Sequence, residues 1–252
     1  MGKLGPFEEN TVVCGDCLEV MRQMPDGCVD LVYADMIWEN LDFGWLIPCR
    51  RILKSTGSIY VQTDYRSAAQ LKLALDELFT FRNWIVWCYK AIPTRNRWYQ
   101  RKHSDILFYT VSNDYTWNEP IQPPSKLALE RFRLDKNGKI LNPTPAMARK
   151  GIHYVRNVVC KDWWDDIPVP SGFSPWDTGH KVHKWQKPIK LLERMIGASS
   201  SIDDLIFDPF MGSGTTAIAA DRLGRRWFGC DIVPAYVEIA MERIAADREK
   251  RR

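Results

Sequence analysis

The feature that most constrains this chain is an alternation of short apolar runs with helical patterns. The runs, which predict strands, are Thr11–Cys14, Val29–Tyr33, Gly57–Val61, Trp84–Trp87, Ile106–Tyr109, Leu205–Phe207 and Trp227–Cys230. Helical patterns follow five of them, at about 18–21, 46–53, 67–78, 213–223 and 235–246. Strands that alternate with helices predict an α/β fold with a doubly wound, mostly parallel sheet.

The stretch from Asn113 to His183 breaks this alternation because it is rich in proline. Its prolines are Pro120, Pro123, Pro124, Pro143, Pro145, Pro168, Pro170 and Pro175. Proline at this density excludes long helices and central strands. An acidic and aromatic cluster, Asp162–Asp166, lies within the same stretch. We expect an irregular insertion on the α/β core.

The composition is that of an ordinary globular protein of 252 residues, 45% hydrophobic and 26% charged. It excludes fibrous and wholly disordered classes, and the length suffices for a core without disulfide or metal. No apolar run approaches the ~18 residues of a membrane span, and the start has no signal-peptide pattern. The seven cysteines include Cys14 and Cys17 at CxxC spacing, but no second cluster completes four zinc ligands. We expect a cytoplasmic protein with no bound metal and no membrane association.

The net charge of +4 is modest but unevenly distributed. Between Lys90 and His103 the chain has no acidic residue, and we predict that this segment binds nucleic acid. The residues expected to do so are Arg95, Arg97, Trp98, Tyr99, Arg101 and Lys102. From Lys126 to Lys161, nine Lys and Arg residues stand against two acidic ones. Cations follow phosphates and aromatic rings stack on bases, whereas the plainer alternative is a solvated loop face.

The segment Phe207–Ala217 places a glycine-rich turn between an apolar strand and a helix. The glycines let the backbone approach a ligand, and the start of the helix offers free N–H donors. Gly212–Ala217 also fits the dinucleotide pattern G-x-G-x-x-G/A, with Asp231 near the usual distance. The carboxylate of Asp208 argues against that alternative, because it suits an ammonium group and repels a pyrophosphate.

Three segments of the C-terminal part, Lys184–Ile196, Phe207–Ala217 and Leu223–Asp231, follow one another at short spacing. Together they closely resemble the C-terminal half of amino-methylating DNA methyltransferases, which act on adenine N6 or cytosine N4. Val13–Met21 and Asp30–Asp35 resemble the N-terminal start of the same family. The order matches the β class, in which the catalytic segment comes first, then the target-recognition region and then the cofactor half.

The resemblance implies a Rossmann-like S-adenosylmethionine-dependent methyltransferase fold, with a seven-stranded and circularly permuted sheet. Residues 1–112 are then the catalytic half of the core. Residues 113–183 are a Pro-rich, basic insertion for target recognition, and residues 184–252 are the cofactor-binding half.

The resemblance also implies a role for individual residues. Asp208 would hold the amino group of S-adenosylmethionine, and Asp231 would bind its ribose. The complete set of implied cofactor-binding residues is Asp16, Asp35, Lys187, Pro188, Asp208, Phe210, Gly212, Gly214 and Asp231. Asp16 would lie near the adenine edge, with a helix cap as its alternative role. Lys187 would border the cofactor carboxylate, with a solvated cation as its alternative.

The catalytic segment departs from the family pattern Asp-Pro-Pro-Tyr, because this chain has Asp35, Met36, Ile37 and Trp38. Asp35 and the carbonyl of Met36 would accept the two hydrogens of the target amino group, and Trp38 would stack on the flipped base. The rigidity of two prolines is lost. Asp35 rather than serine favours adenine as the target.

We therefore expect a DNA methyltransferase acting on duplex DNA, most simply at adenine N6. The alternatives are an N4-cytosine enzyme, an inactive DNA-binding relative, an RNA methyltransferase and a nicotinamide oxidoreductase. A homodimer and a restriction endonuclease partner are both compatible with the sequence, and neither is required by it.

Overall fold

The computed structural model describes residues 2–35, 42–89, 97, 99–122, 139–141, 145, 149, 158–169 and 186–251. The chain divides into a main unit, Met1–Asn118 with Asp162–Arg252, and a small unit, Glu119–Lys161. Within the small unit, strand β8 (Ile121–Gln122) pairs in antiparallel fashion with β9 (Val158–Val159). The small unit thus begins and ends inside the insertion expected from the sequence.

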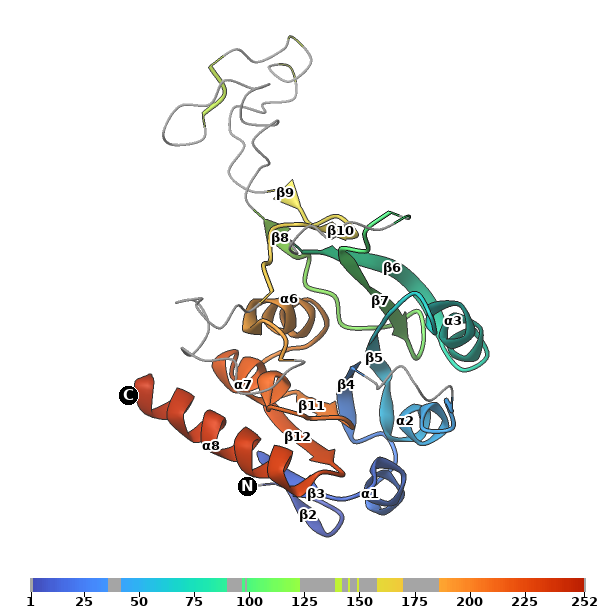
Figure 1. The fold of residues 1–252 in the computed structure, drawn as a ribbon, viewed down its shortest axis with the longest axis vertical. Helices are drawn as coiled ribbons and strands as arrows, with labels where there is room; N and C mark the ends of the chain where they lie inside the picture. The colour runs from blue at the N-terminus through green and yellow to red at the C-terminus, as the bar shows by residue number, and fades with distance from the viewer. Residues whose placement is uncertain are drawn as a thin grey trace. The chain divides into compact units, whose positions relative to one another are not determined.

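The main unit is built on one eight-stranded sheet (Figure 1). Its strands are β3 (Thr11–Cys14), β4 (Val29–Asp35), β5 (Leu53–Thr63), β6 (Thr80–Cys88), β7 (His103–Thr110), β10 (Trp163–Trp164), β11 (Leu205–Asp208) and β12 (Arg226–Asp231). The order across the sheet is β10-β6-β7-β5-β4-β11-β12-β3. Neighbours are parallel, except that β7 runs antiparallel to β5 and to β6. The predicted doubly wound, mostly parallel α/β sheet is confirmed.

Seven strands were predicted, and the main sheet has eight because it includes one further short edge strand. All seven predicted runs form strands, and β10 adds an eighth beside β6. β10 lies in the acidic and aromatic cluster, which was expected to be irregular. Trp164 is buried while Trp163 is exposed, so the pair alternates as an edge strand does. A two-residue ladder carries no periodic signal in the sequence and exists only because β6 offers a free edge.

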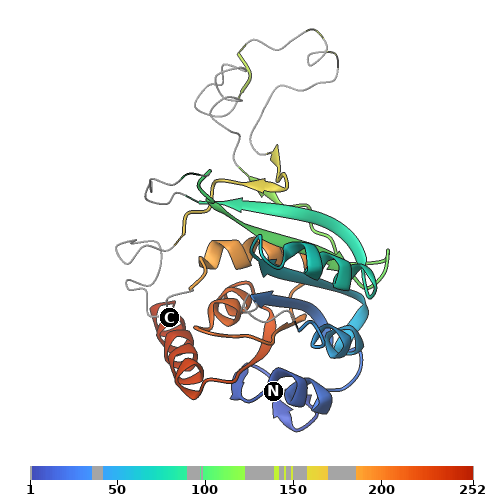
Figure 2. The same ribbon diagram turned by 45° about the vertical axis from the view of Figure 1, so that its right-hand side comes forward.

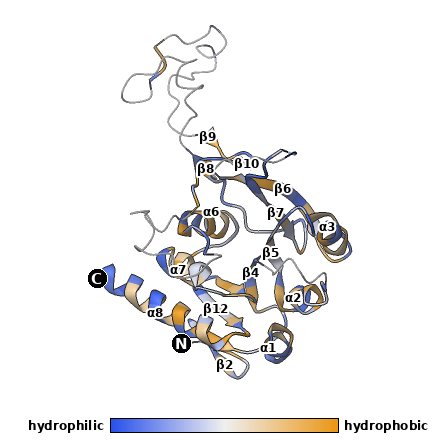
Figure 3. Ribbon diagram, viewed as in Figure 1, coloured by the Kyte–Doolittle hydropathy of each residue, from blue (hydrophilic) through white to orange (hydrophobic). Residues whose placement is uncertain are grey.

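Helices cover both faces of the sheet (Figures 1 and 2). The helices on one face are α1 (Cys17–Gln23), α2 (Leu46–Ile52) and α3 (Ala68–Asp76), whose buried residues share one apolar cluster. Those on the other face are α6 (Ile189–Ser199), α7 (Thr215–Arg222) and α8 (Pro234–Lys250), which share a second cluster. Figure 3 shows α8 becoming hydrophilic toward its C-terminus, where its turns leave the sheet.

A small hairpin, β1 (Lys3–Leu4) with β2 (Phe7–Glu8), precedes the main sheet. Its Phe7 ring stacks on Phe228 of β12 at 5.2 Å between centroids, which ties the N-terminal residues to the sheet. Within the described residues, no helix has the length and apolarity needed to cross a bilayer.

Gly214 shows why a glycine is required at the start of α7. Its φ is +77°, in the left-handed region that side chains disfavour. A Cβ added there lies 3.0 Å from the Cβ of Ala240 and 3.1 Å from its Cα. The residue therefore allows α8 to approach the turn closely, a structural role separate from the predicted role in the cofactor pocket.

We expect Gly214→Ala to lower the free energy of unfolding by about 2–4 kcal/mol, combining left-handed strain with overpacking against α8. Urea unfolding followed by circular dichroism measures the change. The matched control is Gly197→Ala inside α6, where an added Cβ meets nothing within 4 Å. That substitution should stabilise the protein by ~0.5–1 kcal/mol, because glycine is unfavourable inside a helix. Equal effects of the two substitutions would contradict this explanation.

Candidate active site

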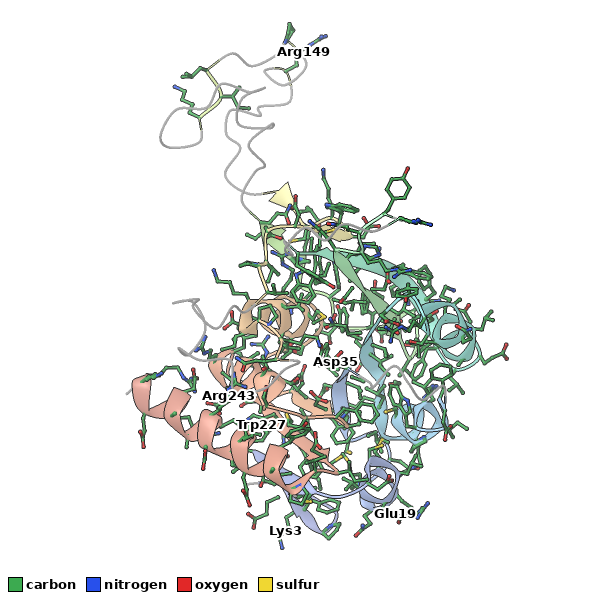
Figure 4. The ribbon with its side chains drawn as sticks, viewed as in Figure 1. Lys3, Glu19, Asp35, Arg149, Trp227 and Arg243 are labelled. Atoms are coloured by element: carbon green, nitrogen blue, oxygen red, sulfur yellow. The ribbon has the colours of Figure 1, made fainter. Side chains whose placement is uncertain are left out.

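Three aspartates end three neighbouring strands of the main sheet. Asp35 is the last residue of β4, Asp208 the last of β11 and Asp231 the last of β12. Because these strands are parallel neighbours, their carboxyl ends meet at one edge of the sheet. This is the edge where open α/β sheets bind ligands. Figure 4 labels Asp35 beside the ribbon of β4.

Asp208 is the most deeply buried of the three, with 2% of its surface exposed. Its Oδ1 accepts a hydrogen bond from the Phe210 amide at 2.9 Å, and its Oδ2 accepts one from the Thr216 hydroxyl. Burial nevertheless raises the pKa of Asp208 to about 7, and the nearby carboxylates of Asp35 and Asp231 act in the same direction. Among the described residues, the charges that act on Asp208 are therefore negative.

Asp231 is held by the backbone on both sides of its carboxylate. The amide of Gly212 donates to Oδ2 at 2.8 Å, and the amide of Val233 donates to Oδ1 at 2.9 Å. Asp231 remains partly exposed, so each oxygen keeps a lone pair for a further donor. The glycine turn thus fixes the direction of the Asp231 side chain. This contact of Gly212 was not predicted from the sequence.

Asp35 forms an ion pair with Lys187, which precedes α6 by two residues. The Lys187 ammonium contacts Oδ2 of Asp35, and the two side chains are 12% and 19% exposed. The other oxygen, Oδ1, is buried and has no hydrogen-bond partner among the described residues. The structure therefore places Lys187 on Asp35, and the predicted contact of Lys187 with the cofactor carboxylate stays a prediction.

Tyr33 and Gln62 lie beside Asp35 and were missed by the sequence analysis. The Tyr33 hydroxyl donates to Oε1 of Gln62 at 2.7 Å, across the pair β4 and β5. Both side chains are buried. A glutamine among the apolar residues of β5, two positions after Tyr60, is the signal that could have identified the pair.

The remaining predicted cofactor residues lie around the same edge. Asp16 caps α1 through Oδ1, which accepts from the amides of Leu18 and Glu19 at 2.8 and 3.3 Å. The Phe210 ring meets Trp45 edge to face at 5.3 Å, and Pro188 occupies the N-cap of α6. Asp16 can cap α1 and still lie near the adenine of the cofactor, so that predicted role stays a prediction. Met36 and Trp38 lie outside the described residues.

The predicted DNA-binding segment joins β6 to β7 at this same edge. Thr63, at the end of β5, pairs with Asp105 near the start of β7, so Arg101, two residues before β7, lies at the same edge of the sheet as the strand-end aspartates. Its guanidinium carbon lies 3.8 Å from the centroid of the Tyr65 ring. Tyr99 is 99% exposed. Arg97 is exposed and Lys102 partly buried, while Arg95 and Trp98 lie outside the described residues.

A family model described as DNA methylase, for N6 and N4 methylation, matches residues 33–242. The chain belongs to this family of amino-methylating DNA methyltransferases. Among similar proteins, the Type II methyltransferase M.HpaI of Haemophilus parainfluenzae is 28% identical, over 95% of this chain and 75% of that protein. The DNA adenine methyltransferase YhdJ of Escherichia coli K12 is also 28% identical, over 94% of this chain and 83% of that protein.

Solved methyltransferase structures share the fold. TTHA0409 of Thermus thermophilus, a putative DNA modification methylase complexed with S-adenosyl-L-methionine, aligns at a TM-score of 0.61 with 22% identity, covering 94% of this chain and 93% of that one. The cytosine-N4-specific PvuII DNA methyltransferase aligns at 0.64 with 17% identity, covering 98% and 96%. The DNA methylase fold predicted from the motif order is confirmed.

The charge of the site fits the methyl donor that this DNA methyltransferase family uses, S-adenosylmethionine. That cofactor carries an ammonium and a sulfonium. The three strand-end carboxylates lie close enough for Asp35 and Asp231 to raise the pKa of Asp208. A cationic ligand relieves this repulsion, whereas a pyrophosphate would add to it.

Proposed function

We propose that this chain transfers the methyl group of S-adenosylmethionine to the exocyclic amino group of a flipped base in duplex DNA, with adenine N6 as the favoured target. The observation that carries the proposal is Asp35, a carboxylate at the end of β4 beside the acidic end of β11. One of its oxygens is paired with Lys187, and the other is buried without a partner among the described residues.

Asp35 activates the amino group by accepting one of its hydrogens. The ion pair with Lys187 fixes the orientation of the carboxylate, which is what a positioned acceptor requires. The carbonyl of Met36, which lies outside the described residues, is proposed to accept the second hydrogen. A nitrogen held in this way directs its lone pair at the methyl carbon, with catalysis by positioning and hydrogen bonding.

The cofactor supplies a methyl group on a positively charged sulfur. On transfer, the demethylated cofactor would leave as a neutral thioether with the bonding electron pair, and the proton lost from the nitrogen would pass to water. We propose that Asp208 and Asp231 bind the ammonium and ribose groups of the cofactor, in line with their positions at the ends of β11 and β12. Asp16, Asp35, Phe210, Gly212, Gly214, Lys187 and Pro188 complete the proposed cofactor site.

The test is methyl transfer from labelled S-adenosylmethionine to unmethylated duplex DNA of mixed sequence, with product nucleosides identified by mass. N6-methyladenine supports the full proposal. N4-methylcytosine supports the mechanism and overturns the choice of base. Transfer only to RNA overturns the substrate, and cofactor binding without transfer to either polymer overturns the activity.

We propose that the catalytic edge holds DNA through the segment that joins β6 to β7. The stacking of Arg101 on Tyr65, which is 51% exposed, orients the guanidinium for a phosphate contact near the base pocket. The small unit and the rest of the basic 113–183 insertion are proposed to read the recognition sequence, in line with their excess of Lys and Arg.

Arg101→Ala should weaken binding to duplex DNA by about 3–10-fold near 0.1 M salt, because one phosphate contact is lost. The slope of log affinity against log salt should fall by about 1, as for a single neutralised phosphate. Fluorescence anisotropy across a salt series measures both. The control is Arg22→Ala on α1, which removes the same charge from an exposed pair with Glu19. An equal loss of slope in both variants would point to net charge alone.

Two further partners belong to this proposal. The relative M.HpaI is named a Type II methyltransferase, which supports a restriction endonuclease partner for this chain. A cytoplasmic location is proposed as well. A homodimer is also proposed as the working state on DNA. Sedimentation of the protein with and without duplex DNA tests the dimer, and a monomer under both conditions would exclude it.

A further inference from the structure

Two buried polar atoms without partners among the described residues belong to side chains that are paired on neighbouring strands. They are Oδ1 of Asp35 on β4 and Nε2 of Gln62 on β5. Within the described residues neither atom has a hydrogen-bond partner. Asp35 and Gln62 are directly opposite each other in the parallel register of β4 and β5. One atom is an acceptor and the other a donor.

The two side chains share one face of the sheet. Tyr33 precedes Asp35 by two residues, so the pleat puts both side chains on the same side. Tyr33 reaches Gln62 on that side, since its hydroxyl contacts Oε1 at 2.7 Å. Lys187, which pairs with Asp35, comes from the segment leading into α6, a helix that packs on this face. Asp35 and Gln62 are therefore adjacent at the catalytic edge.

The hydrogen bond from Tyr33 determines which atom of the Gln62 amide group has no partner among the described residues. Burial, together with the carboxylates of Asp35 and Asp208, raises the pKa of Tyr33 well above its ordinary value, so the phenol stays protonated and donates. That bond occupies the oxygen of the amide. The NH2 end remains as a fixed donor. On the other strand, Lys187 takes Oδ2 of Asp35 and leaves Oδ1 as a fixed acceptor.

A buried donor and a buried acceptor without partners are costly, and a ligand that satisfies both removes the cost. Adenine and cytosine each carry an amino donor directly beside a ring nitrogen that accepts. Guanine and thymine carry an N–H at the corresponding ring position, which would face the Gln62 donor. The pair Asp35 and Gln62 thus matches the Watson–Crick edge of the two amino bases, the edge that enzymes read on a flipped base.

We propose that Gln62, held by Tyr33, contacts the target base by donating from Nε2 to the ring nitrogen beside the amino group that Asp35 binds. The ring nitrogen is N1 of adenine or N3 of cytosine. This inference rests on the proposed methyl transfer and adds a residue that selects amino bases. Because both atoms are buried, base entry requires a local rearrangement at the edge of the sheet.

The test uses a duplex whose methylated position has been mapped with the unmodified protein. The target adenine is then replaced by 1-deazaadenine, which keeps the amino group but has C–H in place of N1; for a cytosine target, 3-deazacytosine serves. The wild-type protein should lose about tenfold in kcat/KM on the analogue, beyond any intrinsic chemical difference, for one lost hydrogen bond. In Gln62→Met, the values of kcat/KM on the ordinary and the analogue duplex should differ only by the intrinsic chemical difference between the two bases.

Controls make the result specific. Gln70→Met, an exposed position on α3, should behave as wild type on both duplexes. Tyr33→Phe keeps the Gln62 amide but removes the hydrogen bond to its oxygen. The ratio of kcat/KM on the ordinary duplex to that on the analogue duplex should then lie between the ratios of wild type and Gln62→Met. The same analogue factor in wild type, Gln62→Met and Tyr33→Phe overturns the inference. No transfer by wild type to the ordinary duplex instead overturns the proposed function.

Discussion

We expect replacement of Asp35 with asparagine to lower methyl transfer to duplex DNA by at least ~10³-fold, the scale for a positioned group that interacts with the reacting atoms. Asparagine keeps the shape of the side chain but loses the charge that pairs with Lys187. An amide nitrogen in place of Oδ1 presents hydrogens to the target amino group, which then meets a donor where it needs an acceptor. Single-turnover transfer with labelled cofactor measures the loss.

The control for this prediction lies on the same strand. Asp30 is the second residue of β4, near the opposite edge of the sheet. It pairs with Lys54 at 2.7 Å and accepts from the Leu205 amide. Asp30→Asn also removes a carboxylate paired with a lysine, but far from the strand-end aspartates. It should leave transfer within about threefold of wild type and affect only stability. A comparable loss in Asp30→Asn, or transfer retained in Asp35→Asn, would show that Asp35 is not the acceptor.

Seven of the eight strands of the main sheet were predictable because each of them contains a compact apolar run. β4, β11 and β12 are buried on both faces by helices, so their sequences are almost continuously apolar and their ends are marked by aspartate. β10 was missed because two residues form a strand only where a partner edge exists. Local sequence also indicated the cap at Asp16, whose partners follow within three residues.

The contacts that define the site were beyond the reach of local patterns. The ion pair of Asp35 and Lys187 joins residues 152 positions apart, and its partners are chosen by how α6 packs on the sheet. The bond between Tyr33 and Gln62 depends on the register of β4 against β5. The family resemblance placed Gly214 in the cofactor site, and no local pattern indicated that Ala240 of α8 packs closely against it. These roles arise from tertiary packing.

Asp208→Asn should weaken cofactor binding by about 30-fold or more, since a hydrogen bond to a charged group contributes ~2–3 kcal/mol. The same substitution should stabilise the cofactor-free protein at pH 8. The pKa of Asp208 is raised to about 7 by burial, so the native state resists the ionisation that the unfolded chain undergoes near its ordinary value of 3.8. Between these values unfolding releases a proton, and stability falls as the pH rises.

Asparagine does not ionise, so the variant does not lose stability in this way. The gain in the free energy of unfolding of Asp208→Asn over the wild type therefore grows from about pH 4 to pH 7 and reaches at most ~4 kcal/mol above pH 7. Asparagine also keeps both local contacts, because its oxygen accepts from the Phe210 amide and its nitrogen donates to the Thr216 hydroxyl. Thermal unfolding at pH 8 and pH 5 should show a large gain in Tm at pH 8 and a smaller one at pH 5. S-adenosylmethionine should raise the Tm of the variant less than that of the wild type.

Asp231→Asn separates binding from stability. Asp231 is partly exposed and accepts from the amides of Gly212 and Val233, and asparagine can accept only one of these bonds through its oxygen. It should weaken cofactor binding without stabilising the protein at either pH. If Asp208→Asn destabilised the protein at pH 8 as well, the buried carboxylate would be a structural anchor. If it stabilises the protein and loses the cofactor, the main sheet accepts an unfavourable charge at β11 because a cationic ligand compensates it.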